Sequence, residues 1–136
     1  MKRKPDPERC FLAGVLVAEA HGIASGVSQR LEHRLDGRAK ERIGSDLDRS
    51  RHLLKDAVVT HGAACRLELA RFKAETITVQ KALAGNLFDK AKEKAVAAMI
   101  TALDCLGNLH EACAPRWQKI CQRGEYGWNG KKRRTS

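Results

Sequence analysis

Apolar residues recur at steps of three and four along most of this chain, which is the spacing of one face of an α-helix. Between Pro7 and Leu35 they are Leu12, Leu16, Ala20, Ile23, Val27 and Leu31. A row of small residues follows at steps of four and predicts close packing against another helix: Gly14, Ala18, Gly22 and Gly26. Interior glycines also weaken a helix, so a break between residues 22 and 26 is the alternative.

The longest stripe lies between Ser45, a good N-cap, and the terminating Gly85. It consists of Leu47, Leu54, Val58, His61, Cys65, Leu69, Phe72, Thr76, Val79 and Leu83. This pattern predicts one long helix, unless Gly62 bends or splits it. The charged residues 36–44 before it are expected to form a connection with at most one helical turn.

A second, smaller apolar stripe runs along the same segment: Ala63, Leu67, Ala70, Ala74 and Ile77. A helix that is apolar on two sides needs neighbours on both. We therefore predict that these five residues form an interface with a partner protein or with another copy of the chain.

A third helix is predicted to begin at its cap, Asn86, and to end or kink at Pro115. A short amphipathic piece, residues 117–123, continues it, and no strand pattern occurs anywhere. The fold class is therefore all-α, a small bundle of three to four long helices. We expect a helical bundle domain over residues 1–123 and a flexible basic tail over residues 124–136.

Charge is unevenly distributed along the chain. The formal net charge is +10, yet residues 52–115 carry eight bases and seven acids, whereas residues 116–136 carry seven bases and one acid. Small basic proteins most often have polyanionic partners. The end of the chain is thus the first place to look for a binding site.

The C-terminal bases can neutralise phosphates, and the two aromatic residues among them can stack on unpaired bases. The predicted nucleic-acid-binding residues are Arg116, Lys119, Arg123, Tyr126, Trp128, Lys131, Lys132, Arg133 and Arg134. The alternatives are that these residues only keep the chain soluble, that they form a nuclear-localisation signal, or that they contact a membrane or an acidic protein. A weaker basic row lies on the helices, at Arg66, Lys73, Lys81, Lys90, Lys92 and Lys94, and interleaved acids favour an ordinary salt-bridged face there.

Catalysis and metal binding have little support in the residue pattern. Zinc ligation by Cys105, His110, Cys113 and Cys121 would need a closely spaced cysteine pair, which this set lacks. A nucleophilic pair of Cys65 and His61 lies on the apolar stripe and has no orienting third group. We expect no enzyme activity, cofactor or metal.

Five cysteines, an odd number at wide spacing, do not suggest a disulfide framework, so reduced and buried thiols are expected. The N-terminal residues loosely imitate a signal peptide, but Asp6, Glu8 and Glu19 interrupt the pattern. No stretch approaches the ~20 apolar residues of a membrane span. The expected location is therefore the cytoplasm, without membrane contact.

These observations predict a non-enzymatic binding protein, a nucleic-acid-associated accessory subunit. It would contact the phosphate backbone non-specifically through its basic tail and helix faces, and self-associate or bind a partner protein. The alternative is a protein–protein adaptor or inhibitor of the phage or plasmid accessory type, using the apolar stripes of the long central segment.

Overall fold

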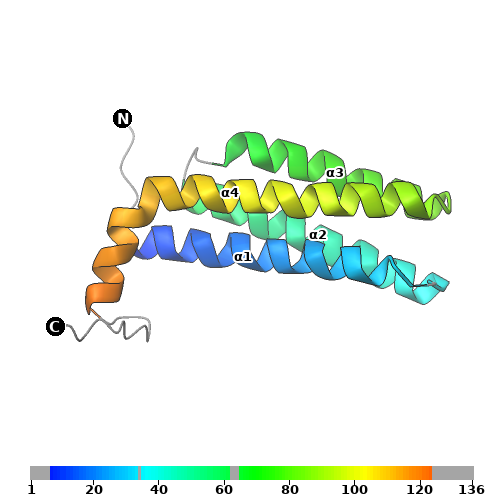
Figure 1. Ribbon diagram of the computed structural model, residues 1–136, viewed down its shortest axis with the longest axis horizontal. Helices are drawn as coiled ribbons and strands as arrows, with labels where there is room; N and C mark the ends of the chain where they lie inside the picture. The colour runs from blue at the N-terminus through cyan, green and yellow to red at the C-terminus, as the bar shows by residue number, and fades with distance from the viewer. Residues whose placement is uncertain (1–6, 34, 62–64, 124–136) are drawn as a thin grey trace.

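A computed structural model describes residues 7–33, 35–61 and 65–123, with the side chains of residues 7, 61 and 114–123 left out. It contains four helices: α1 (Pro7–Arg30), α2 (Gly37–His61), α3 (Arg66–Ala84) and α4 (Phe88–Arg123) (Figure 1). No strand occurs in the described part. The all-α bundle predicted from the sequence is confirmed.

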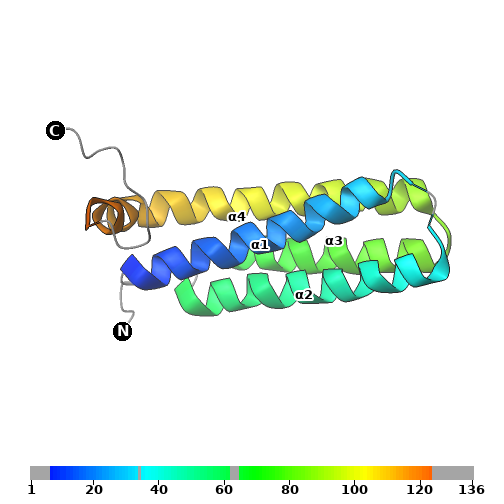
Figure 2. The same cartoon turned by 90° about the horizontal axis from the view of Figure 1, so that it is seen from below.

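Consecutive helices run antiparallel and pack side by side (Figures 1 and 2). Helix α1 lies between α2 and α4, and α3 completes the bundle between α4 and α2. We call the end where α1 begins, α3 begins and α4 finishes the terminal end, and the opposite end the far end. The segments before α1 and after α4 are therefore both attached at the terminal end.

The core is built by α1 and α4, which present buried residues at alternating steps of three and four. In α1 these are Cys10, Ala13, Val17, Ala20, Ala24 and Val27, and in α4 they are Ala91, Ala95, Ala98, Ala102, Cys105 and Leu109. Most of them are alanines, whose small side chains bring the helices close together. Leu54 of α2 and Phe72 of α3 supply bulk from the other side, and both are fully buried.

Helix α2 begins eight residues before the predicted cap at Ser45. Asp36 is the actual N-cap, because its carboxylate accepts a 2.8 Å hydrogen bond from the backbone N–H of Ala39. Residues 37–44 are thus helical and not a connection, and they bury Ile43 completely.

The long segment predicted between residues 45 and 84 is split into α2 and α3, the alternative that Gly62 had suggested. At the other end of α3, the N–H of Leu87 donates to the carbonyl of Ala82 at 2.7 Å, and Asn86 adopts the left-handed conformation with φ of 59°. Asn86 is therefore the C-terminal turn residue of α3. The predicted end of the helix at Gly85 is confirmed, because Gly85 is the C-cap of α3. The predicted role of Asn86 as cap of α4 is wrong, because α4 begins only at Phe88.

Helix α1 is unbroken through its glycines, but the close approach predicted at them is not observed. A Cβ added at Gly22 or Gly26 would meet nothing within 4 Å.

We therefore expect Gly26→Ala to raise the free energy of unfolding by about 1 kcal/mol through helix propensity alone. Gly44→Ala is the control and should gain less, since its Cβ would lie 3.4 Å from Nε2 of Gln80. Urea unfolding measures both, and a loss of stability at Gly26 would contradict this packing.

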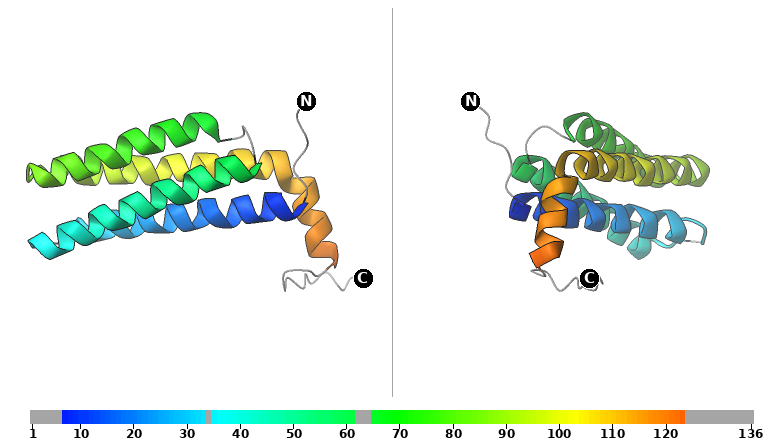
Figure 3. Two further views of the ribbon diagram at one scale, coloured as in Figure 1. Left: turned by 180° about the vertical axis from the view of Figure 1, so that it is seen from behind. Right: turned by 60° about the vertical axis from the view of Figure 1, so that its left-hand side comes forward.

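Pro115 lies within α4, where it cannot donate a hydrogen bond to the preceding turn. The helix continues to Arg123 but changes direction sharply in its C-terminal part, which is orange in Figures 1 and 3. The predicted kink is consistent with this bend. The last part of α4 therefore leaves the bundle at the terminal end.

Two disulfides tie the terminal end together, contrary to the expectation of reduced thiols. Cys10 of α1 is bonded to Cys113 of α4, and Cys65, just before α3, is bonded to Cys105 of α4. The Cα atoms of the pairs lie 5.8 and 5.2 Å apart. Sequence spacing hid these pairs because the antiparallel packing of α4 against α1 and α3 brings them together.

Helix α1 also differs from the prediction that no stretch approaches a membrane span. Residues 8–30 of α1 are long and apolar enough to cross a membrane by length and composition. The core helix of a soluble bundle and an N-terminal signal sequence pass the same test. In this structure the helix packs against α2 and α4, with its core positions fully buried.

Candidate polyanion-binding surface

The described side chains separate charge between the two layers of the bundle. Helices α2 and α3 together carry ten bases and six acids, whereas α1 and the described side chains of α4 carry five bases and six acids. With the two acids of the α1–α2 connection, the described side chains sum to +1. The remaining +9 of the chain's +10 belongs to Arg34 and to the terminal segments outside the described side chains.

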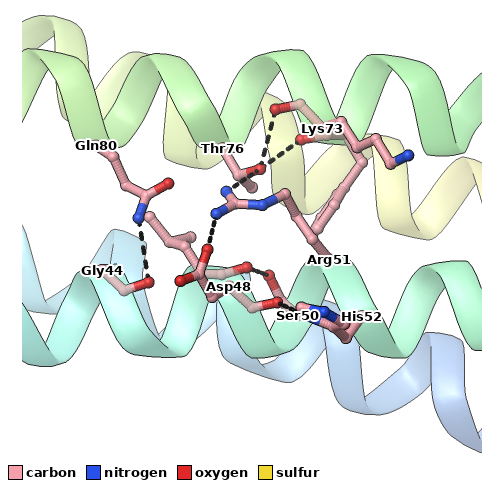
Figure 4. Close-up of polar contacts among 10 residues, drawn as sticks. Gly44, Asp48, Ser50, Arg51, His52, Lys73, Thr76 and Gln80 are labelled. Carbon is pink, nitrogen blue, oxygen red and sulfur yellow. Dashed lines mark hydrogen bonds and ion pairs between the residues drawn. The ribbon is translucent and has the colours of Figure 1, made fainter.

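The seam between α2 and α3 is polar (Figure 4). The guanidinium of Arg51 lies between the helices, where it donates a 2.9 Å hydrogen bond to Oγ1 of Thr76 and also pairs with Asp48. Further along, Nε2 of Gln80 donates to the carbonyl oxygen of Gly44 at 3.2 Å. These polar contacts join the helices beside buried apolar residues, such as Leu47 and Val79, that α2 and α3 add to one core cluster.

A groove of about 310 Å³ opens beside Arg51, and we call it the α2–α3 groove. It is lined by Arg51, His52, Lys55, Lys73 and Ile77. Within the described chain, neither Lys55 nor Lys73 has an acidic partner, while the carboxylate of Asp48 already offsets Arg51. The groove therefore presents uncompensated positive charge to solvent.

The groove lies near the middle of the bundle: Arg51 donates a hydrogen bond to Thr76, and the neighbouring Glu75 accepts one from Thr101, about halfway along the part of α4 that precedes its bend. A second hollow of about 250 Å³ follows the same seam towards the far end. It is lined by Lys40, Glu41, Gly44, Gln80, Leu83 and Ala84, and one base and one acid balance there. The positive part of the seam is thus nearer the terminal end than the neutral part.

The basic row predicted on the helices is divided by the structure. Lys73 lines the groove, and Arg66, Lys81 and Lys90 are exposed. Lys92 lies 2.8 Å from the carboxylate of Glu32, and its hydrogen bond and charge lower the pKa of Glu32. For Lys92 the salt-bridged face is therefore the correct interpretation, whereas Lys73 is left unpaired.

The predicted tail residues lie outside the part of the chain whose side chains are described. Arg116, Lys119 and Arg123 belong to the last part of α4, and their side chains are not placed. Tyr126, Trp128, Lys131, Lys132, Arg133 and Arg134 follow the end of that helix. Their predicted role therefore stays a prediction.

The predicted partner stripe on α3 is exposed to solvent. Leu67 is 77% exposed and Ile77 is 42% exposed, and Ala70 and Ala74 lie between them on the outer side of the helix. Ala63 lies outside the described residues. The stripe is therefore free for a partner, although no partner is placed on it.

Among the described residues, no group of three or more possible metal ligands comes together. Cys105 and Cys113, two members of the zinc set that the sequence suggested, are engaged in different disulfides. Cys65 of the suggested nucleophilic pair is likewise bonded to Cys105. The structure thus uses these cysteines to crosslink helices.

Sequence reasoning missed Arg51, His52 and Lys55 as site residues. Their spacing along one helix was visible, but the groove exists only because α3 folds back beside α2 and adds Lys73.

No protein-family model matches this chain, and neither the search of curated proteins nor the search of solved structures finds a match.

Proposed function

We propose that this protein binds nucleic acid, as a non-enzymatic accessory subunit, by contacting the phosphate backbone without reading sequence. The observation that carries the proposal is the separation of charge: the described bundle is nearly neutral, and the excess cation is concentrated in the terminal segments. A segment that carries more bases than acids can replace the counterions of a polyanion.

The bundle supports this role by its arrangement. Helix α1 begins and α4 ends at the terminal end, and the α2–α3 groove lies about halfway along the bundle. A polyanion held at that end would reach Lys55 and Lys73 if it continued along the α2–α3 side of the bundle. The two disulfides brace the helices from which those segments leave.

Non-specific contact fits the chemistry of the groove. Lysine is a flexible point charge that attracts phosphate from many directions, whereas base recognition usually needs fixed bidentate donors. The guanidinium of Arg51 could act as a bidentate donor, but it already binds Asp48 and Thr76. Tyr126 and Trp128 remain the candidates for stacking on unpaired bases.

The predicted cytoplasmic location stays a prediction, and one feature speaks against it. Disulfides persist in oxidising compartments and are rare in the cytosol. We therefore favour an oxidising location over the cytoplasm. Absence of enzyme activity, cofactor and membrane contact also stay predictions.

A protein–protein adaptor is the second candidate, favoured by the exposure of Leu67 on the α3 stripe. Freshly purified protein distinguishes the two functions by its ultraviolet absorbance. Under the nucleic-acid proposal, we expect a high ratio of absorbance at about 260 nm to that at about 280 nm, which a wash in about 1 M salt lowers because binding depends on counterion release. Clean protein that instead retains a partner protein through the same wash would favour the adaptor.

A further inference from the structure

We propose that the far end of the bundle binds a small carboxylate that has an apolar body, such as an aromatic or short aliphatic acid. A cavity of about 400 Å³ lies there, and we call it the far-end cavity. Its described lining residues are Leu31, His33, Leu35, Lys40, Asn86 and Phe88. A cavity of this size is typical of small-molecule sites. This inference does not depend on nucleic-acid binding, because the α2–α3 groove shares none of these residues.

The far-end cavity is formed by the two connections at this end of the bundle (Figure 2). Residues 31–35 follow α1, and Asn86 lies in the turn between α3 and α4. Lys40 in the first turn of α2 and Phe88 at the start of α4 complete the lining. The backbone N–H groups of His33 and Asn86 each donate a 3.1 Å hydrogen bond to a carbonyl of the preceding helix. The site is therefore largely formed before a ligand binds, which lowers the entropic cost of binding.

The ammonium of Lys40 is held at the cavity wall by two neutral groups. Its Nζ donates a hydrogen bond to Oδ1 of Asn86 and lies 5.3 Å from the centroid of the Phe88 ring. No acid lies among the described lining residues of the far-end cavity. An ammonium has three N–H donors, so Lys40 keeps donors for an anion.

The acids close to Lys40 in the sequence or at the same end do not neutralise it. The carboxylate of Glu32 pairs with another lysine, and that of Asp36 accepts a hydrogen bond at the start of α2. Glu41 borders the neighbouring hollow together with Lys40, but no ion pair among the described side chains joins Lys40 to it or to Asp89. The positive charge is therefore left for a ligand.

The rest of the cavity wall is apolar and joins the core. Leu31 is only 7% exposed and belongs to the core cluster at this end, and Leu35 packs against that cluster. Phe88 is 38% exposed, so its ring is available to a ligand. An apolar body in the cavity would remove these three side chains from water while its carboxylate met Lys40. Apolar walls with few fixed polar groups are typical of sites for such ligands.

The chemistry of the wall favours a carboxylate over a phosphate. A single ammonium matches one negative charge, whereas a phosphate carries nearly two at neutral pH. Leu31 and Leu35 offer no side-chain donor to the additional phosphate oxygens, and leaving those oxygens unpaired is costly. The imidazole of His33 can donate to the second oxygen of a carboxylate. A nucleic-acid backbone fits less well, because its repeated phosphates need a row of exposed cations.

The test is a nuclear magnetic resonance titration of the disulfide-bonded full chain, freed of nucleic acid by nuclease and kept at constant ionic strength. Phenylacetate is the probe, phenylacetamide is its uncharged match, and acetate and inorganic phosphate are anions without an apolar body. We expect phenylacetate to shift the amide signals of the lining residues with a dissociation constant of about 1 mM or below. The other three should bind at least about tenfold more weakly, because each lacks the charge or the apolar body.

Three variants separate the contributions of charge and apolar contact. Lys40→Met removes the charge but keeps an apolar stem, so it should weaken phenylacetate at least about tenfold and leave phenylacetamide unchanged. Phe88→Ala should weaken both ligands by a similar factor, because both lose the ring contact. Lys81→Met is the matched control, since Lys81 is exposed in the last turn of α3 and is not a described lining residue. It should change neither affinity, and circular dichroism checks that each variant is folded.

Equal affinity for phenylacetate and phenylacetamide would overturn the proposal, and this comparison needs no variant. So would phosphate that binds as tightly as phenylacetate, or an absence of shifts up to about 10 mM phenylacetate. Shifts confined to the α2–α3 groove, or equal losses in Lys81→Met and Lys40→Met, would overturn it too. None of these results bears on nucleic-acid binding by the terminal segments, which is tested separately.

Discussion

Reduction of the two disulfides will lower the free energy of unfolding by several kcal/mol. Cys10 and Cys113 are separated by 103 residues and Cys65 and Cys105 by 40, so each bond removes much conformational freedom from the unfolded chain. The loop-closure model assigns about 4.7 kcal/mol to the longer loop and about 4 kcal/mol to the shorter one. The loops are nested, so the combined loss should be somewhat below the sum. Since small domains are stable by only about 5–15 kcal/mol, the reduced protein should be close to unfolding.

The measurement is chemical unfolding followed by circular dichroism, with and without dithiothreitol. The double variant Cys10→Ala and Cys113→Ala and the double variant Cys65→Ala and Cys105→Ala separate the two bonds, and each pair serves as the control for the other. The first pair should be the more damaging because its loop is longer. Unfolding curves that coincide with and without the reductant would contradict the crosslinked terminal end.

Replacing Lys131, Lys132, Arg133 and Arg134 by alanine will weaken binding to nucleic acid by ~100-fold or more at low salt. Each cation that contacts a phosphate contributes about 0.9 to the slope of log affinity against log salt concentration. The variant should therefore lose about 3 to 4 from that slope if all four residues reach phosphates. The loss should be similar for duplexes of unrelated sequence, because phosphate contacts carry no sequence information.

A charge-matched variant controls for the general loss of positive charge. Arg38, Arg42, Lys81 and Lys90 are exposed and lie near the far end of the bundle. Their replacement by alanine removes the same four charges but should change affinity and slope much less. Fluorescence anisotropy with labelled oligonucleotides measures both variants, and equal losses in the two would mean that net charge alone, and not the tail, carries the binding.

The helices were predictable because their apolar stripes record which face is buried. The sequence pattern also indicated the early start of α2, because Ala39, Ile43 and Leu47 continue its apolar stripe at steps of four. Ile43 is fully buried. The abundance of charge in residues 36–44 concealed it. A charged helix is still a helix when a capping aspartate and one apolar row support it.

The disulfides and the α2–α3 groove were not predictable in the same way. Both depend on residues that only the antiparallel packing brings together, such as Cys10 with Cys113 and Arg51 with Lys73. No local spacing encodes such pairs. The near neutrality of residues 52–115, by contrast, is a matter of counting charges in the sequence.

The central claim is that cations concentrated at one end of a nearly neutral bundle hold a polyanion by its phosphates. The most direct measurement is the affinity of the wild-type protein for several oligonucleotide duplexes of unrelated sequence, followed from about 50 to 200 mM salt. With six or more phosphate contacts, we expect all duplexes to fall on one steep straight line and lose at least about a thousandfold in affinity. A flat line, or affinity that depends on sequence and not on salt, would contradict the account.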